Sequence, residues 1–95
     1  MSFEPPVIEH KKTVTGGVFR IGRDAIMSYK NDGADGIIVN HTRVAKHAEG
    51  KGLGRALYRS MVDYARSQNL KVTPACSYVK TQFERSPADA DVLSS

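Results

Sequence analysis

The sequence predicts an α+β domain in which helices pack on a mainly antiparallel sheet, with one central helix and one C-terminal helix. Two observations carry this prediction. The chain before residue 45 consists of short β-branched or alternating stretches separated by glycine-containing turns. A long amphipathic stretch, a short apolar stretch and a second amphipathic stretch then follow. Strands that precede helices in this way are typical of the α+β class.

Four strands are expected in the N-terminal half. The stretch "VFRIG" alternates apolar and polar residues, and "IIVNHTRV" is rich in β-branched residues, as expected for strands. The expected strands cover residues 7–13, 18–21, 25–30 and 37–44. The turns between them are predicted at the pair Gly16 and Gly17, at residues 22–24 and at residues 31–36.

The helix after residue 50 follows from its periodicity. Apolar residues recur at spacings of four, four and three, at Leu53, Leu57, Met61 and Tyr64. These spacings place the four side chains on one helical face. Asn69 is expected to end the helix.

The C-terminal third is expected to add one strand and one helix. Residues 70–76 are interpreted as a strand with Pro74 near its end, and residues 77–85 as a helix capped by Ser77. The polar stretch 87–95 is expected to be loop-like. We therefore treat residues 1–95 as one domain with a core at about 7–86.

Composition restricts the function classes. Hydrophobic residues make up 40% and charged residues 25% of the 95 residues, which is ordinary for a globular protein. Neither a membrane span nor an export signal is expected, and Cys76 is the single cysteine. A reducing, cytoplasmic location is the simplest interpretation. One cysteine and three scattered histidines match no metal-ligand spacing, so no metal is expected.

The net charge of +4 is compatible with anionic partners. The basic residues are spread along the chain, whereas a nucleic-acid-binding segment is usually denser. We therefore do not expect nucleic acid as the partner. A weak nucleic-acid binder stays an alternative, and steep salt dependence of binding to mixed oligonucleotides would favour it.

Three alternating glycines, Gly50, Gly52 and Gly54, stand directly before the central helix. Glycine permits positive φ and close approach of a ligand to the backbone. The unpaired N–H groups at a helix start attract anions, commonly phosphate. The spacing fits neither the dinucleotide fingerprint nor the P-loop. The alternative is a flexible turn without a ligand.

The stretch "EGKGLGRAL" resembles the coenzyme-A-binding signature of the GNAT superfamily of N-acetyltransferases. The joint pattern "HTRV…GKGLGRAL…DYAR…LKVTPACSYV" is similar to the small, single-domain GNAT-like proteins of the YjdJ type, and the likeness extends from about residue 18 to 85. It implies a minimal GNAT-like fold that uses acetyl-CoA as cosubstrate and an amine as acceptor.

The resemblance also implies a binding mode. The strand ending at Val44 would offer backbone groups to the pantetheine arm of coenzyme A. The pyrophosphate would lie against the N–H groups of the glycine loop, and side-chain charges would assist. The residues implied for binding are Val44, Gly50, Lys51, Gly52, Leu53, Gly54 and Arg55. The acetyl group would lie where this strand and the strand before Cys76 separate.

Several positions depart from the family pattern. Glu49 stands where these proteins usually have Gln or Arg, and we expect its carboxylate to point to solvent. The helical pair after the first strand and the last strands of the family are absent from the predicted elements. Many members of the family have a tyrosine in the last helix that protonates the departing thiolate. This chain has Phe83 near that position, and Tyr78 is a candidate to replace the tyrosine.

Cys76 and His41 form the candidate catalytic pair. A thiol between a strand and a helix N-terminus has a lowered pKa and can attack a thioester. His41 could act as the base that activates the thiol or the incoming amine. The alternatives are a packing role for Cys76 and a structural hydrogen bond for His41.

From these residues we expect an N-acetyltransferase that transfers acetyl from acetyl-CoA to an unidentified amine, directly or through Cys76. The alternative is a coenzyme A or acetyl-CoA binding module, or a sensor, without turnover.

Overall fold

A computed structural model of the chain describes residues 7–94. One five-stranded sheet runs in the order β1-β2-β3-β4-β5, with β1 to β4 antiparallel and β5 parallel to β4. The strands are β1 (Glu9–Lys12), β2 (Gly16–Ile21), β3 (Ala25–Asn31), β4 (Gly36–Val44) and β5 (Lys71–Pro74). The helices are α1 (Leu53–Ser67) and α2 (Ser77–Glu84), with short 3-10 helices η1 (Lys46–Ala48) and η2 (Pro87–Val92).

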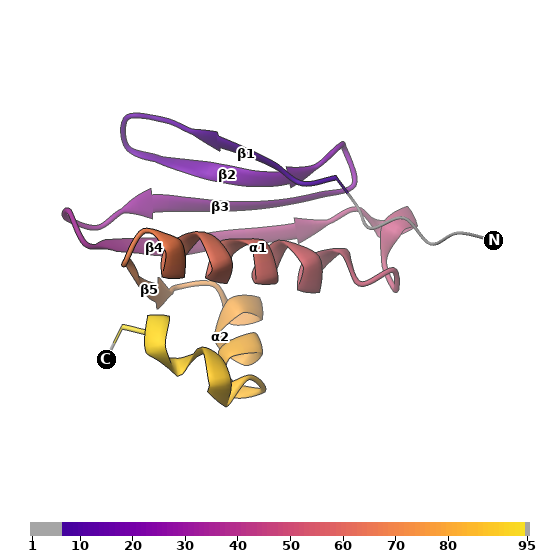
Figure 1. The fold of residues 1–95 in the computed structure, drawn as a ribbon. Coiled ribbons are helices and arrows are strands. Elements are labelled where there is room, and N and C mark those ends of the chain that lie inside the picture. The colour runs from indigo at the N-terminus through magenta and orange to yellow at the C-terminus, as the bar shows by residue number, and fades with distance from the viewer. Residues whose placement is uncertain (1–6, 95) are drawn as a thin grey trace.

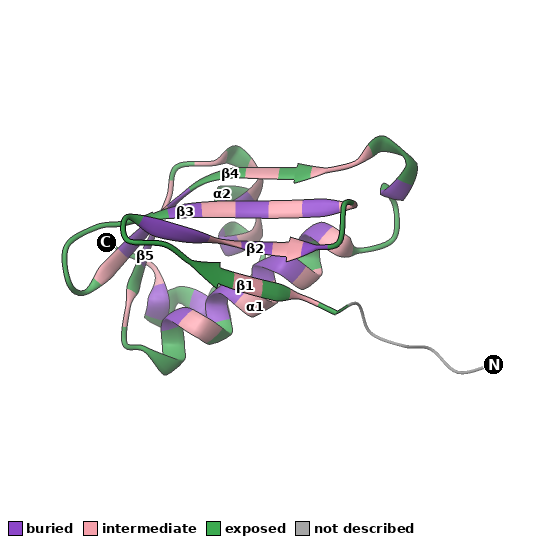
Figure 2. Cartoon of the chain, turned by 90° about the horizontal axis from the view of Figure 1, so that it is seen from above, coloured by how far each residue is buried: buried purple, intermediate pink, exposed green. Residues whose placement is uncertain are grey.

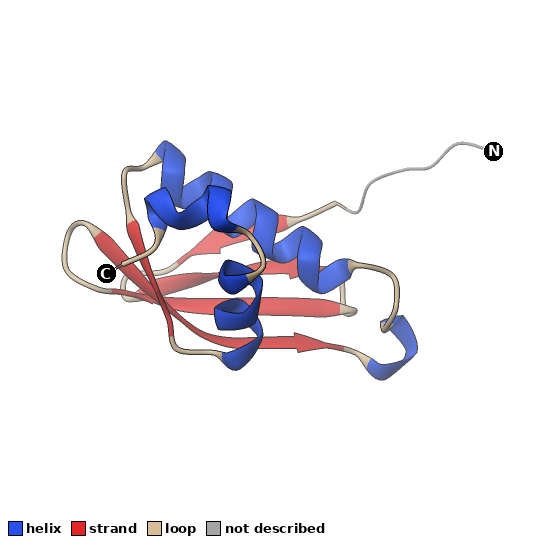
Figure 3. Cartoon of the chain, turned by 90° about the horizontal axis from the view of Figure 1, so that it is seen from below, coloured by secondary structure: helices blue, strands red, loops and turns tan. Residues whose placement is uncertain are grey.

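Both α-helices cover one face of the sheet. Figure 1 shows α1 and α2 below the strands, and Figure 3 shows them in front of the sheet when the molecule is viewed from below. On the opposite face, seen in Figure 2, none of the residues 7–94 forms a covering helix. The core between the sheet and α1 contains Phe19, Met27, Tyr29, Ile37, Val39, Leu57, Met61 and Val62. This two-layer arrangement is the α+β class that the sequence predicts.

Helix α1 forms where the apolar periodicity predicts it. Leu57 and Met61 are fully buried, while Leu53 and Tyr64 pack at the edge of the core. Burying a large side chain of this kind contributes about 1.5–3 kcal/mol. Asn69 has a φ of 56°, and this left-handed residue follows the last turn, as expected for a helix end.

The prediction of a turn at Gly16 and Gly17 was wrong. Both residues lie inside β2, and the turn lies at residues 13–15 instead. A Cβ on Gly16 would lie 2.1 Å from the Tyr29 carbonyl oxygen, and a Cβ on Gly17 would lie 2.5 Å from the Tyr29 hydroxyl. The two glycines therefore permit close packing against β3 and do not serve chain reversal.

The prediction of a loop-like tail over 87–95 was also wrong for most of that stretch. Residues 87–92 form η2, in which Asp89 and Val92 are each only 3% exposed. Leu93 bridges to Val72 of β5. Most residues of this stretch are polar or small, which predicts a loop. The segment is nevertheless ordered because Asp89 is hydrogen-bonded by residues of α1 that are far away in the sequence.

No helix among residues 7–94 combines the length and apolar content that crossing a membrane requires.

Candidate functional site

Strands β4 and β5 separate halfway along β4. Their parallel pairing ends at Val39 and Pro74, after which the N–H groups of Ala75 and Cys76 both donate to the Val39 carbonyl, at 3.0 and 3.1 Å. From Asn40 to Val44, β4 pairs only with β3. One edge of this segment therefore has backbone donors and acceptors that β5 does not satisfy.

The glycine loop leads from η1 into α1. Gly50 and Gly52 have φ values of 82° and 75°, a conformation that glycine adopts without strain. Gly52 is the N-cap of α1, and no side chain caps the helix. The helix begins its hydrogen bonding at Ala56, whose N–H donates to the Gly52 carbonyl. The N–H groups of the first turn before Ala56 are therefore available, and the helix dipole adds partial positive charge there.

Gly54 makes a tight contact between the two helices. A Cβ at this position would lie 2.7 Å from the hydroxyl of Tyr78 on α2. Burial raises the pKa of Tyr78, although the charges of Arg55 and Arg85 oppose the rise. Tyr78 therefore keeps its proton at neutral pH and places a neutral hydroxyl at the start of α1. This is the position of the substitute proton donor considered above, whereas Phe83 is buried against Tyr58.

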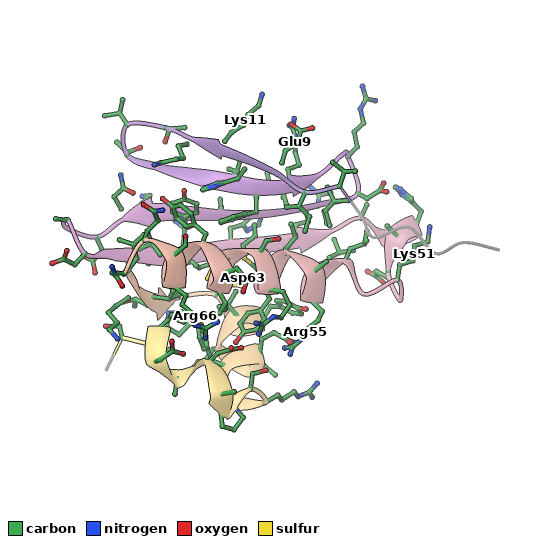
Figure 4. The ribbon with its side chains drawn as sticks, in the orientation of Figure 1. Glu9, Lys11, Lys51, Arg55, Asp63 and Arg66 are labelled. Atoms are coloured by element: carbon green, nitrogen blue, oxygen red, sulfur yellow. The ribbon has the colours of Figure 1, made fainter. Side chains whose placement is uncertain are left out.

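The charged residues of the loop differ in their surroundings. Lys51 is exposed on the loop between η1 and α1, where Figure 4 labels it, and Glu49 is also exposed. The Arg55 guanidinium donates to Gln82 at 2.7 Å and to Ser86 at 3.0 Å, and it lies over the ring of Tyr58. The Arg55 side chain is thus held against α2 and the C-terminal segment. At the glycine loop, only the backbone N–H of Arg55 is then available to an anion.

Cys76 lies where β5 has left β4, and it is the N-cap of α2. The expected capping residue, Ser77, is instead the first residue of the helix. The Cys76 thiol is 3.5 Å from the hydroxyl of Thr42 on β4. Burial raises the pKa of this thiol, but hydrogen bonds from the Thr42 hydroxyl and from the N–H groups of Val79 and Tyr78 outweigh it, so the pKa is lowered overall.

His41 is not placed beside Cys76. In the register of β4 with β3, Thr42 pairs with the buried Met27, so its side chain lies on the helix-covered face. His41 pairs with Ser28, so its exposed side chain lies on the opposite face, because successive strand residues alternate. Thr42 is therefore the residue that contacts the thiol. The sequence could have indicated Thr42, because it lies two residues before the apolar Val44 in the strand and therefore shares its face.

The other two histidines have structural partners. His10 hydrogen-bonds the Tyr29 hydroxyl and stacks on Phe19, and burial lowers its pKa. His47 is 3.0 Å from Asp24, which joins the loop after β4 to the β2–β3 turn. Across residues 7–94, no three His, Cys, Asp or Glu side chains are grouped so as to hold a metal ion.

Comparison with known proteins is decisive at this point. The family model described as GCN5-related N-acetyl-transferase matches residues 18–92, from within β2 to the end of η2. The chain belongs to the GCN5-related N-acetyltransferase family. A solution structure of a GCN5-like candidate N-acetyltransferase from Staphylococcus aureus is 31% identical, with a TM-score of 0.71 over 90% of this chain and 87% of that chain. None of the curated proteins searched matches the chain.

Membership of the GCN5-related N-acetyltransferase family indicates which reaction the open edge of β4 and the glycine loop belong to. The chain is an enzyme of the acetyltransferase class, and the family uses acetyl-CoA as cosubstrate. The sequence resemblance to this family and the predicted α+β fold are thus confirmed.

Proposed function

We propose that this protein binds acetyl-CoA along the open edge of β4 and at the start of α1, and transfers the acetyl group to an amine. The observation that supports this most is the separation of β4 from β5 directly beside an uncapped helix start. The open edge of β4 and the start of α1 both have backbone groups without partners, and coenzyme A carries both an amide-containing arm and a pyrophosphate.

In this proposal the pyrophosphate accepts hydrogen bonds from the N–H groups of Leu53, Gly54 and Arg55. The left-handed glycines, Gly50 and Gly52, let the loop present these groups without a Cβ in the way. Lys51 adds a positive charge from the exposed side of the loop. Glu49 is exposed, which lets its carboxylate stay in solvent.

The pantetheine arm then takes the place beside Asn40 to Val44 that β5 leaves empty. Its amides would pair with the backbone of β4 as a strand would. The thioester at the end of the arm would lie near Thr42 and Cys76, because these two residues meet where the strands separate.

Cys76 is the proposed first acceptor of the acetyl group. The thiolate attacks the thioester carbonyl, a new C–S bond forms, and the bond to the coenzyme A sulfur breaks, so that coenzyme A leaves as a thiolate. The lowered pKa of Cys76 increases the fraction of thiol that is ionised and able to attack. Tyr78, which keeps its proton, can protonate the departing sulfur and regain a proton from solvent.

The amine then attacks the acetyl group on Cys76. A new C–N bond forms, the C–S bond to Cys76 breaks, and the cysteine leaves as a thiolate. The amine loses one proton to a base. His41, the base predicted from the sequence, has its side chain on the sheet face opposite Thr42, so we assign this proton to solvent water and not to His41. A cytoplasmic location belongs to this proposal, since the thiol must stay reduced.

The test is the mass of the intact protein after incubation with acetyl-CoA. We expect one added acetyl group on Cys76 that hydroxylamine removes, since a thioester is labile and an amide is not. Cys76→Ala should lose the adduct and still bind acetyl-CoA. Thr42→Val keeps the shape of the side chain but removes its hydroxyl. Relative to the wild type, it should slow adduct formation more at neutral pH than at high pH, where the thiol ionises without help.

Two results would contradict parts of the proposal. If an amine is acetylated but no adduct forms in the wild-type protein, the amine attacks acetyl-CoA directly and Cys76 has only a packing role. If acetyl-CoA binds but neither adduct nor acetylated amine appears, the protein is a coenzyme A binding module, and the transferase function is wrong.

A further inference from the structure

A basic concavity lies on the sheet face that no helix covers. It has a volume of about 300 Å³, which is the lower limit for small-molecule sites, and it is lined by Arg20, Arg23, Asp24, Ile26 and Arg43. In the strand register, Ile26 of β3 is the partner of both Arg20 on β2 and Arg43 on β4. Arg20 and Arg43 therefore flank Ile26, which gives the concavity an apolar floor.

The arginines of this concavity have few anionic partners. Asp24 is held by His47 at 3.0 Å, and Glu9 is 3.7 Å from Arg20. Within residues 7–94, neither Arg23 nor Arg43 forms an ion pair with a carboxylate. The Nε atom of Arg20 is buried and has no hydrogen-bond partner there. A buried donor of this kind is stabilised when a ligand or a water supplies the acceptor.

The concavity adjoins the proposed transfer site from the other side of β4. Arg43 follows Thr42 in the chain, and Thr42 contacts Cys76. His41 shares the face of Arg43, two residues away along the strand, because side chains alternate. A molecule held at Arg43 would thus lie on the face of His41, and its amine would reach Cys76 around the open edge of β4.

We propose that this concavity holds an anionic group, a carboxylate or a phosphate, of the acceptor amine. The proposal rests on the transferase function proposed above. Planar guanidinium groups bind both anions with paired hydrogen bonds, and three arginines line this concavity together with one carboxylate, Asp24. The concavity and the open edge of β4 are about two strand spacings apart, or roughly 10 Å. The acceptor should therefore carry its anion and its amine at about this separation.

The binding experiment uses the protein saturated with coenzyme A and three probes of equal length: 6-aminohexyl phosphate, 6-aminohexanoate and 6-aminohexanol. Backbone amide signals are followed by NMR. We expect saturable shifts at residues 20–26 and 43–45 with the two acids and no saturation with the alcohol. Comparing the phosphate with the carboxylate identifies which anion is preferred.

Two variants make the binding experiment specific. Arg43→Gln should weaken binding of the preferred acid by at least about tenfold, because a charged hydrogen-bond partner is lost. Lys11→Gln is the matched control, since Lys11 lies on the same open face outside the concavity, as Figure 4 shows, and should bind as the wild type does. Equal weakening in both variants, no saturation with either acid, or competition between the acid and coenzyme A would overturn the proposal.

A turnover measurement separates this proposal from the proposed function. With acetyl-CoA, we expect kcat/KM for the preferred acid to exceed that for the alcohol by about tenfold or more, and Arg43→Gln to remove the difference. If all three amines are acetylated equally, the transferase function stands and the acceptor assignment is wrong. If the acids bind but no amine is acetylated, the transferase function fails, and with it the assignment of the bound anion to an acceptor.

Discussion

At the scale of single residues, the two left-handed glycines Gly52 and Gly33 have nearly the same backbone and different surroundings. Their φ values are 75° and 70°, and neither has a neighbouring atom within 4 Å of a Cβ position. Gly52 caps α1, whereas Gly33 lies in the turn between β3 and β4. A substitution introduces the same backbone strain at both positions. A difference in acetyl-CoA affinity between the two variants is therefore due to the position of Gly52 at the start of α1.

Gly52→Asp should abolish measurable acetyl-CoA binding. The new carboxylate would compete with phosphate for the N–H groups of the first turn and repel its charge. The matched control is Gly33→Asp, which should cost a similar amount of stability, about 1 kcal/mol, and keep its affinity. Calorimetric titration of both variants with acetyl-CoA checks this prediction. Equal affinity in the two variants would show that the helix start does not bind the ligand.

At the scale of elements, η2 is joined to α1 by one buried carboxylate. Asp89 accepts hydrogen bonds from Tyr58 at 2.8 Å, from Arg59 at 2.7 Å and from Arg66 at 3.3 Å. Burial raises the pKa of Asp89, but the hydrogen bonds from Tyr58 and Arg66 and the charge of Arg59 outweigh it, so the pKa is lowered overall. The C-terminal segment thus depends on an ionised side chain.

Asp89→Asn should reduce the free energy of unfolding by about 2–4 kcal/mol at pH 7, because two arginines lose a buried anionic partner. Since the pKa of Asp89 is lower in the folded protein, its stabilising effect is complete above about pH 4, the unfolded value, and is lost as the pH falls through the folded value. Urea unfolding at pH 7 and pH 3 should therefore show a smaller difference between variant and wild type at pH 3.

The control for Asp89 is Asp91→Asn. Asp91 also accepts from Arg66, at 2.8 Å, but its side chain is 54% exposed. Its substitution should have a much smaller effect at pH 7, because exposed ion pairs contribute little. An equal loss in the two variants would mean that the buried position of Asp89 is not what stabilises η2.

At the scale of the whole molecule, local patterns predicted most elements, and long-range contacts account for what was missed. Alternation, β-branched content and helical periodicity depend on neighbouring residues, so β1 to β5, α1 and α2 could be predicted from the sequence. The partner of Asp89 on α1 and the contact of Thr42 with Cys76 join residues far apart in the chain. Neither follows from a local pattern.

For the candidate site too, the local motif could be predicted from the sequence and the long-range placement could not. The glycine loop is a local motif, and the structure places it at the start of α1 as expected. The side of β4 on which His41 lies depends on the register with β3, which shifts between Ser28 and Tyr29. The basic concavity depends on three strand segments meeting on one face, so its arginines are spread along the sequence.

The central claim is that acetyl-CoA completes the sheet where β5 leaves β4, and amide hydrogen exchange tests it most directly. Acetyl-CoA should slow the exchange of β4 amides between Asn40 and Val44 that face the gap, and of the first-turn amides Leu53 to Arg55. Amides from Gly36 to Val39, already paired with β5, and those of the edge strand β1 should not change. Measurable binding with protection elsewhere, and none at these two segments, would contradict the account.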